Sequence, residues 1–283
     1  MEFFNEIVKN ITKFSNDSEF VKAVVMIGSQ ARNEFGADKY SDLDIILIVN
    51  DTDYFLNSDA WLKNIGDFKI SFTENSLGGT KERRVMFDGA KDVDFIIYPF
   101  DDKKDMDSEI FGIFKRGYKI LVDKIGITDD ILKKMTNIPV KKEILMQNEF
   151  DILVNDFWFH SVWSAKKLLR GELWSAKFCV DSYMKRLLLK IIEWHSYCEN
   201  GWDYEIWHDG RFIDKWANDR VTEKFSEIFS HYEKSDIKIA LFATMDLFRM
   251  LAIEIAQKLD YSYSFIADEN AVKWVNELFR ERI

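Results

Sequence analysis

Residues 24–32, VVMIGSQAR, and residues 41–49, SDLDIILIV, decide the fold. The first segment begins with the apolar run Val24–Ile27, which predicts a buried strand. Gly28 can adopt backbone conformations that other residues resist, and it lets a ligand approach the backbone closely. Ser29 adds a hydroxyl and a backbone N–H at the start of a short helix, where phosphate groups are favoured. The first segment therefore predicts a strand that ends in a phosphate-binding turn.

The second segment predicts another strand, which opens with two carboxylates. Side chains alternate between the faces of a strand, so Asp42 and Asp44 share one face while Leu43, Ile45 and Leu47 point into the core. Two carboxylates this close repel each other strongly unless a cation lies between them, and Mg²⁺ commonly joins such groups to substrate phosphates. The alternative is a surface strand that begins with solvated acids. The Gly-Ser turn upstream and the apolar run downstream favour a nucleotide and metal site.

Asp94 is a third candidate, because it also begins an apolar strand. If that strand lies beside the strand of Asp42 and Asp44, the three acids converge at one edge of a sheet and can hold metal ions. Asp94 would then ligate Mg²⁺ and accept the proton of an attacking hydroxyl. The alternative is a solvated residue that follows a hairpin turn. Asp92 shares the face of Asp94, so it stays open as a further candidate.

Phosphate groups would be held by the residues around the Gly-Ser turn. We expect Gly28 and Ser29 to bind the triphosphate, with Arg32 reaching the same anion through its planar donor fork. Lys166, on a later helix, is expected to neutralise the leaving pyrophosphate. The alternatives are a surface salt bridge for Arg32 and a surface lysine with a partly buried stem for Lys166.

The composition narrows the class of ligand. The chain has 283 residues with 39 Lys and Arg against 49 Asp and Glu, a formal net charge of −10. Binding to a nucleic acid requires a basic surface, so the charge favours a neutral or cationic small molecule. The start lacks a signal-peptide pattern, and no run of about 18 apolar residues predicts a membrane span. We therefore expect a cytoplasmic protein that binds neither nucleic acid nor membrane.

The periodicity of apolar residues changes near Pro139, one of two prolines in the chain. We expect an α+β domain over residues 1–138 and a helical domain over residues 139–283. The first domain is predicted to begin with a helix and to contain further strands near 69–73, 84–87, 93–98 and 119–123. The second is predicted to contain a long helix that ends at Gly171, followed by helices at 172–197, 222–232, 236–259 and 268–281.

The spacing Gly28-Ser29…Asp42-Leu43-Asp44 resembles the signature of the DNA polymerase β-like nucleotidyltransferases. More of the chain looks like the aminoglycoside 6-adenylyltransferases that modify streptomycin. The segments that carry this resemblance are Asp59–Leu62, Asn148–Phe150, Trp163–Lys166, Arg170, the helix around Trp194, Phe212–Asp214, Leu247–Arg249 and Leu259–Tyr263, and Asp94 falls where that family has its third acid. Two departures are Gln30, where the family tends to have arginine, and Leu43, where it tends to have an aromatic residue.

The resemblance implies an activity and an architecture. The activity is Mg²⁺-dependent transfer of AMP from ATP to a hydroxyl of the antibiotic, with release of pyrophosphate. The architecture is a nucleotidyltransferase domain with a mixed β-sheet flanked by helices, followed by a helical bundle that binds the acceptor. Because streptomycin is cationic, acids and aromatic residues of the helical domain are candidates for its site, namely Glu149, Asp156, Asp181, Asp203, Glu205, Asp209, Trp158, Trp202 and Trp207.

Two alternatives to this function stay open. One keeps the chemistry and changes the acceptor to a lincosamide, another metabolite or a protein side chain. The other is a nucleotide-binding protein that has lost catalysis, and the intact acids Asp42, Asp44 and Asp94 weigh against it.

Overall fold

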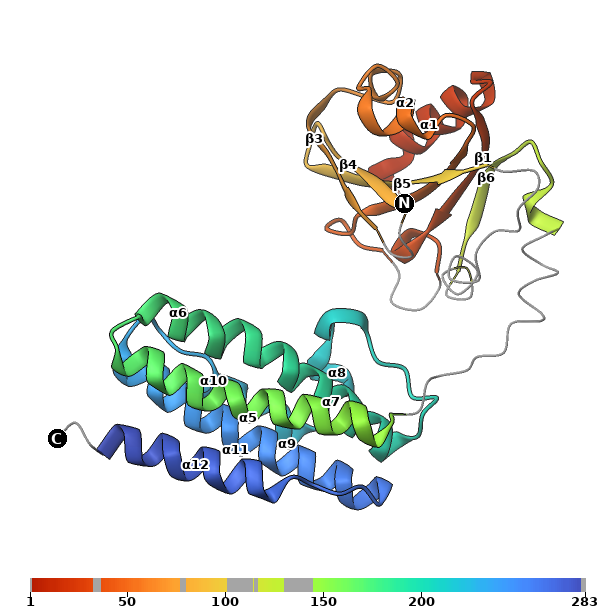
Figure 1. Cartoon of the computed structure of the whole chain (residues 1–283). Coiled ribbons are helices and arrows are strands. Elements are labelled where there is room, and N and C mark those ends of the chain that lie inside the picture. The colour runs from red at the N-terminus through yellow and green to blue at the C-terminus, as the bar shows by residue number, and fades with distance from the viewer. Residues whose placement is uncertain are drawn as a thin grey trace. The chain divides into compact units, whose positions relative to one another are not determined.

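The computed structural model describes residues 2–32, 37–76, 80–100, 114, 117–129 and 145–280. It divides into two compact units, Met1–Val140 and Lys141–Ile283 (Figure 1). The boundary predicted at residues 138 and 139 lies outside the described residues.

The first unit is built on a mixed sheet of six strands in the order β3-β4-β5-β2-β1-β6 (Figure 1). Strands β2 and β5 are parallel, and every other neighbouring pair is antiparallel. This arrangement confirms the α+β fold class. Its elements are η1 (Glu2–Phe4), α1 (Asn5–Asp17), β1 (Val21–Ile27), η2 (Gly28–Gln30), β2 (Leu43–Val49), α2 (Thr52–Asn57), η3 (Leu62–Asn64), β3 (Phe68–Asn75), β4 (Lys81–Phe87), β5 (Lys91–Pro99) and β6 (Lys119–Asp123).

The two faces of this sheet are covered differently. On one face, α1, α2 and η3 bury a core that includes Leu43, Ile45 and Leu47, as the alternation of side chains predicted. On the other face, Ile46 and Ile48 pack into a smaller apolar cluster. Asp42 and Asp44 share the parity of Ile46 and Ile48, so their carboxylates lie beyond the end of this smaller cluster. This face of the sheet therefore has an apolar cluster with a polar, acidic edge beside it.

The second unit is a helical bundle, which agrees with the predicted architecture (Figure 1). Helix α5 contacts α6, α7, α11 and α12. In its core the rings of Phe157 and Phe248 stack with centroids 3.6 Å apart. Its elements are α5 (Gln147–Leu169), α6 (Leu173–Phe178), the π-helical turn η5 (Cys179–Tyr183), α7 (Met184–Asn200), η6 (His208–Gly210), α8 (Ile213–Trp216), α9 (Asp219–Thr222), α10 (Phe225–Ile228), α11 (Lys234–Leu259) and α12 (Phe265–Arg280).

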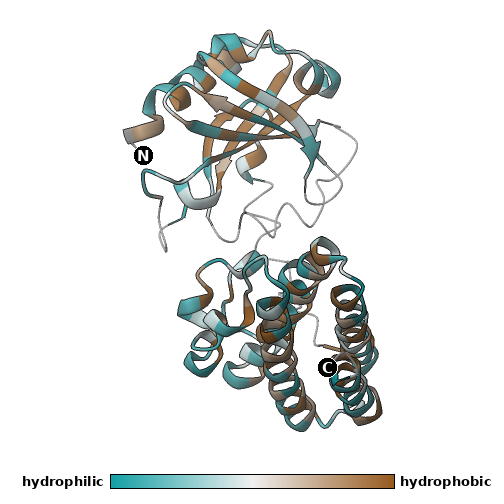
Figure 2. Cartoon of the chain, turned by 90° about the vertical axis from the view of Figure 1, so that its left-hand side faces the viewer, coloured by the Kyte–Doolittle hydropathy of each residue, from teal (hydrophilic) through white to brown (hydrophobic). Residues whose placement is uncertain are grey.

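Hydropathy follows these two architectures. Strands β1 and β2 are largely apolar and buried, whereas β3 and β4 carry many polar side chains. Figure 2 shows hydrophobic and hydrophilic segments both in the sheet and along the helices. Strands buried on both faces are apolar throughout, but a helix that packs on one side needs only an apolar stripe. None of the helices in the described ranges is both long and apolar enough to cross a membrane.

Two predicted helices differ from the structure. The helix expected at 222–232 is wrong, because only α9 and α10 form and residues 229–233 are not helical. Ser230 there bonds the Asp181 carboxylate through both its backbone N–H and its hydroxyl, which holds the chain away from a helical path. The helix expected at 172–197 is interrupted by η5 and extends to Asn200. The predicted helix end at Gly171 is confirmed, with φ of +79°.

Candidate active site

The turn after β1 brings the backbone against an acidic side chain. Gly28 has φ of +68°, and a Cβ atom built on it would overlap the carboxylate of Asp44, lying 2.9 Å from its Cγ. Only glycine fits this position, because both its conformation and its space exclude a side chain. The next residue, Ser29, is 6% exposed, and its Oγ makes no hydrogen bond with the residues that the structure describes. Four buried serine hydroxyls of the described chain lack a partner, and that of Ser29 is the one beside the acidic edge, where it can bond to a ligand oxygen.

The three predicted acids lie together. Strands β2 and β5 pair in parallel with Asp44 opposite Asp94, and one carboxylate oxygen of each of Asp42, Asp44 and Asp94 lies within 4.8 Å of the others. Three carboxylates this close repel one another, and a bound cation or protonation of one carboxyl relieves this repulsion. Asp92 lies opposite Met86 and falls outside this cluster.

Electrostatics single out Asp94. Burial raises the pKa of this carboxyl to about 6, with Arg84 opposing the shift and Glu82, Asp42 and Asp92 adding to it. Its side chain is only 14% exposed. A carboxylate that titrates near neutral pH suits a general base, because it is ionised when it must accept a proton and still basic enough to hold one.

Arg84 is a site residue that the sequence did not reveal. It lies on β4 directly opposite Asp94, and its Nη2 is 3.3 Å from Asp94 Oδ2. Its Nε is also 2.7 Å from Glu82 Oε1 and 2.6 Å from Glu74 Oε1. The signal that could have found it is the hairpin turn at 88–90, because counting back from it pairs Arg84 with Asp94 across the two strands.

Two further residues fix the Gly-Ser turn. Gln30 Nε2 donates to the backbone oxygen of Asp42 at 3.4 Å, and Lys119 Nζ on β6 donates to the backbone oxygen of Gln30 at 2.7 Å. Gln30 is 6% exposed and therefore acts as a buried link between the turn and the first acid. The side chain that departs from the family pattern thus has a defined structural role.

The remaining predicted ligands lie in different places. Arg32 follows the turn and is half-buried, close to the backbone of Gly117. Lys166 lies on α5 in the helical unit, where it lines a groove of about 720 Å³ between α5 and α12 together with Trp163 and Trp274. Their binding of phosphate stays a prediction.

Several of the acceptor candidates have partners inside the helical unit. Asp181 pairs with Lys177, and Asp156 accepts a 2.8 Å hydrogen bond from the Tyr183 hydroxyl. Glu149 accepts from the backbone N–H of Met146 at 3.2 Å, and the buried Trp158 donates to the Tyr263 hydroxyl at 3.1 Å. These contacts give the four candidates structural roles. His160 on α5 packs against Tyr183, with 4.4 Å between the ring centroids.

The fold and the site together define a class of protein. A mixed sheet with a Gly-Ser turn at the end of one strand and carboxylates on the next two strands is the arrangement of a nucleotidyltransferase. A family model described as streptomycin adenylyltransferase matches residues 1–278. The chain therefore belongs to the streptomycin adenylyltransferase family, which confirms the family predicted from the sequence.

Curated relatives agree with this assignment. An aminoglycoside 6-adenylyltransferase of Bacillus subtilis (strain 168) is 23% identical over 287 residues, which cover 97% of each chain. The Staphylococcus aureus protein of the same name is 26% identical over 237 residues, covering 81% of this chain and 80% of the relative. That of Campylobacter jejuni is 23% identical over 279 residues, covering 95% and 93%. A crystal structure of an aminoglycoside 6-adenyltransferase from Bacillus subtilis is 20% identical, covers 97% of this chain and 96% of its own, and has a TM-score of 0.46.

Proposed function

We propose that this protein transfers AMP from ATP, in the presence of Mg²⁺, to a hydroxyl of a cationic aminoglycoside such as streptomycin, with release of pyrophosphate. The observation that carries the proposal is the cluster of Asp42, Asp44 and Asp94 beside a glycine whose backbone touches one of them. The relatives are named aminoglycoside 6-adenylyltransferases, and this supports the choice of acceptor.

The residues of the site fit a divalent cation. Three carboxylates offer the hard oxygen ligands that Mg²⁺ prefers, and the orphaned Ser29 hydroxyl lies on the turn beside them. When bound, Mg²⁺ would neutralise the charge of the phosphates and orient them for displacement. Asp42, Asp44 and Asp94 would hold it.

Each residue of the site would then have a separate role in an in-line displacement at the α-phosphorus of ATP. Ser29 and the backbone at Gly28 bind and orient the triphosphate, with Arg32 as a second donor. Asp94 accepts the proton of the acceptor hydroxyl as its oxygen bonds to the α-phosphorus and the bond to pyrophosphate breaks. Arg84 is a positioning residue that holds one oxygen of Asp94. Lys166 is proposed to neutralise the departing pyrophosphate.

The role of Asp94 is tested by Asp94→Asn with Asp92→Asn as the matched control. Both substitutions remove one negative charge from the same face of β5, two residues apart, but Asp92 lies outside the acid cluster. We expect Asp94→Asn to reduce the transfer of label from α-labelled ATP to streptomycin by at least about 10²-fold, because general-base catalysis contributes about that much. Asp92→Asn should retain most of the activity. Equal losses in the two variants would remove Asp94 from the role of base.

The acceptor is tested by measuring pyrophosphate release with streptomycin, a lincosamide and a neutral sugar alcohol. We expect release with streptomycin, and a raised inhibitory concentration of streptomycin for a sensitive bacterium that expresses the protein. Asp94→Asn, expressed at the same level, should give no protection. Release with a different acceptor alone would keep the chemistry and overturn the choice of aminoglycoside.

A further inference from the structure

The order of the strands puts the phosphate-binding turn and Asp94 on different sides of β2. Strand β1, which leads into the Gly28-Ser29 turn, lies on one side of β2, and β5 with Asp94 lies on the other. In phosphoryl transfer the attacking and leaving oxygens lie roughly in line across the phosphorus. If the phosphates bind at the buried hydroxyl of Ser29, the acceptor hydroxyl approaches from the side of Asp94, where β4 and β3 continue the sheet.

The strand register shows which side chains of β4 and β3 lie on the face of the acid cluster. One row of directly opposed residues crosses four strands, from β2 to β3, and consists of Asp44, Asp94, Arg84 and Phe72. Residues opposed in this way share a face of the sheet, and Ile70 shares it too because it lies two residues from Phe72. Phe72 is 48% exposed, and Ile70 is exposed as well. An open apolar surface therefore lies beyond Asp94 on the edge strand.

The same face has an excess of negative charge. In the next row, Glu82 on β4 lies directly opposite Glu74 on β3, and like charges in such positions repel each other. The Nε atom of Arg84 lies 2.6 Å from Glu74 Oε1 and 2.7 Å from Glu82 Oε1, and the same guanidinium faces Asp94. One guanidinium cannot neutralise three carboxylates. Glu82 is buried, but the side chain of Glu74 is about half exposed, so Glu74 can pair with a cation of a ligand.

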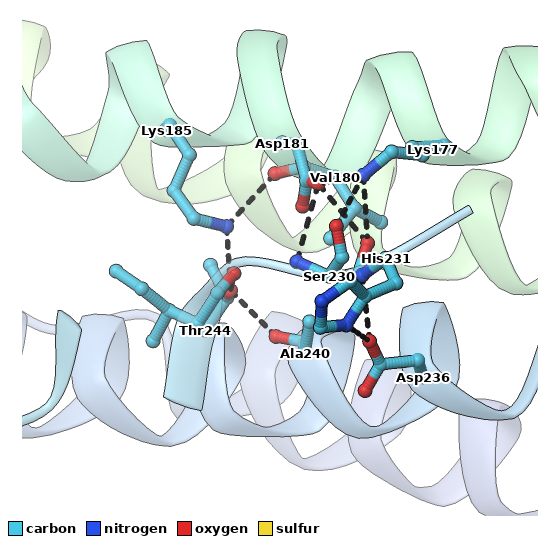
Figure 3. Close-up of polar contacts among 10 residues, drawn as sticks. Lys177, Val180, Asp181, Lys185, Ser230, His231, Asp236, Ala240 and Thr244 are labelled. Carbon is cyan, nitrogen blue, oxygen red and sulfur yellow. Dashed lines mark hydrogen bonds and ion pairs between the residues drawn. The ribbon is translucent and has the colours of Figure 1, made fainter. Parts of the chain in front are cut away.

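An acid of the helical unit makes a useful contrast. Asp181 pairs with Lys177, and it accepts hydrogen bonds from both the backbone N–H and the hydroxyl of Ser230 (Figure 3). Its charge is therefore matched by a lysine and by two further donors of the bundle. Glu74 differs because it shares its arginine with two other carboxylates.

We propose that Phe72 and Glu74 of the edge strand β3 form the acceptor side of the active site and select a cationic acceptor with several rings. This assignment rests on the proposed function. Two strand spacings, about 10 Å in all, separate Phe72 from Asp94, so a molecule of more than one ring is needed to contact both. Phe72 packs against a ring and its cationic substituent, and Glu74 pairs with an ammonium or guanidinium group of the acceptor.

The acceptor hydroxyl then lies at Asp94. Its oxygen bonds to the α-phosphorus, its proton passes to the Asp94 carboxylate, and the bond from phosphorus to pyrophosphate breaks. Phe72 and Glu74 take no part in these steps. They determine which acceptor is held, so their substitution should affect the KM for the acceptor more than kcat.

Steady-state kinetics with streptomycin as the varied acceptor, at saturating Mg²⁺ and ATP, test this assignment. We expect Glu74→Gln to raise the KM for streptomycin at least about 10-fold, as for the loss of a hydrogen bond between charged groups. Phe72→Ala should raise it about 2- to 5-fold, as for an exposed contact between a cation and a ring. The KM for ATP should stay unchanged in both variants, which also shows that they fold.

Asp59→Asn is the matched control. Asp59 pairs with Arg83, which lies on the opposite face of β4, and its side chain is about half exposed, as is that of Glu74. The control thus removes one negative charge and one ion pair to the same strand, but away from the acceptor side. The KM for streptomycin should stay at the wild-type value. Glu74→Asp, which keeps the charge, should recover part of the affinity that Glu74→Gln loses.

The outcomes separate the acceptor side from the proposed function. An unchanged KM for streptomycin in Glu74→Gln and Phe72→Ala, in a protein whose activity is lost in Asp94→Asn, would overturn the acceptor side and leave adenylyl transfer in place. Equal rises in KM for Glu74→Gln and Asp59→Asn would do the same. A raised KM for ATP in Glu74→Gln would put this residue on the nucleotide side instead. A wild-type chain that transfers no AMP to streptomycin would overturn both proposals.

Discussion

Gly28 carries no side chain at the point where its backbone passes Asp44. The space that a Cβ would need is occupied by the Asp44 carboxylate, and the left-handed backbone of Gly28 disfavours any other residue. The geometry of the acid cluster thus requires a residue without a side chain at position 28, in addition to the three acids.

We predict that Gly28→Ala removes most of the activity. The new methyl group must displace the Asp44 carboxylate, and a displacement of about 1 Å at a reacting centre can reduce the rate about 10²-fold. Gly126→Ala is the matched control, because Gly126 has φ of +73° but nothing within 4 Å of its missing Cβ. Steady-state rates of the two variants separate the effect of the clash from that of backbone strain. Equal rates in the two variants would contradict the importance of the clash.

The raised pKa of Asp94 predicts a pH-dependent stability of the metal-free protein. Its pKa is 3.8 in ordinary surroundings and about 6 in the folded state, so the folded protein binds more protons than the unfolded chain between these values. The free energy of unfolding should therefore fall as the pH rises from about 4 to 6, by up to about 3 kcal/mol. In Asp94→Asn this contribution is absent, so its free energy of unfolding should not show this decrease.

Denaturant unfolding in the presence of a chelator, at several pH values, measures this difference between the wild-type chain and Asp94→Asn. At pH 7, added Mg²⁺ should bring the free energies of unfolding of the two proteins closer together, because a bound cation stabilises the ionised Asp94 of the wild type. Parallel curves for the two proteins over the whole pH range would show that Asp94 ionises freely in the folded state.

Site residues could be predicted where residue type and position in a strand indicate the role. They could not be predicted where the role depends on a partner on another strand. Asp42, Asp44 and Asp94 each begin an apolar strand, so their type and position indicated a shared edge. Arg84 ends a charged run, Lys81–Arg84, in which adjacent residues occupy alternate faces of the strand. Its role depends on the register of the hairpin, which local propensity does not determine.

At the scale of elements, one buried acid of α12 links this helix to polar groups of its neighbours. Asp268 is 2% exposed, and it accepts hydrogen bonds from Arg249 Nε on α11 at 2.7 Å and from the Tyr263 hydroxyl at 2.9 Å. Tyr263 in turn accepts from Trp158 on α5. A single carboxylate thus connects three helices.

We expect Asp268→Ala to lower the free energy of unfolding by about 3 kcal/mol or more, because it leaves a partly buried guanidinium without its partner. Glu269→Ala, an exposed acid one residue further along the same helix, should change it by less than about 0.5 kcal/mol. Chemical denaturation of the two variants checks the difference, and similar losses would mean that helix propensity rather than the ion pair is responsible.

The same scale shows where prediction from the sequence succeeds and fails. Strands β2 and β5 are short apolar runs, and α5 and α11 are long segments rich in apolar residues, so their positions were predictable. The π-helical turn at Cys179–Tyr183 and the break at residues 229–233 result from contacts such as that between Ser230 and Asp181, which are 49 residues apart. Periodicity within a short window contains no information about such contacts.

At the scale of the whole molecule, each unit has a hydrophobic core of its own. Trp61 is the only one of the nine tryptophans that falls in residues 1–140, and it is fully buried with its Nε1 donating to the backbone oxygen of Phe55 at 3.1 Å. The intrinsic fluorescence of the protein therefore comes mainly from the helical unit.

We predict that thermal unfolding of the full chain is not a single two-state transition. Calorimetry should resolve two transitions, and one of them should produce little change in tryptophan fluorescence because it belongs to the unit that contains only Trp61. Comparing the calorimetric trace with the fluorescence trace of the same sample checks this. A single transition seen identically by both methods would mean that the units unfold together.

The parallel pairing of β2 with β5 has a consequence for folding. The aspartates that it aligns, Asp44 and Asp94, are separated by fifty positions of chain, and the alignment is correct in only one register. A slip of one residue would turn Asp94 toward the side covered by α1 and α2. A chain in which this pairing has not formed, or is misaligned by one residue, thus contains all three acids but cannot bring them together.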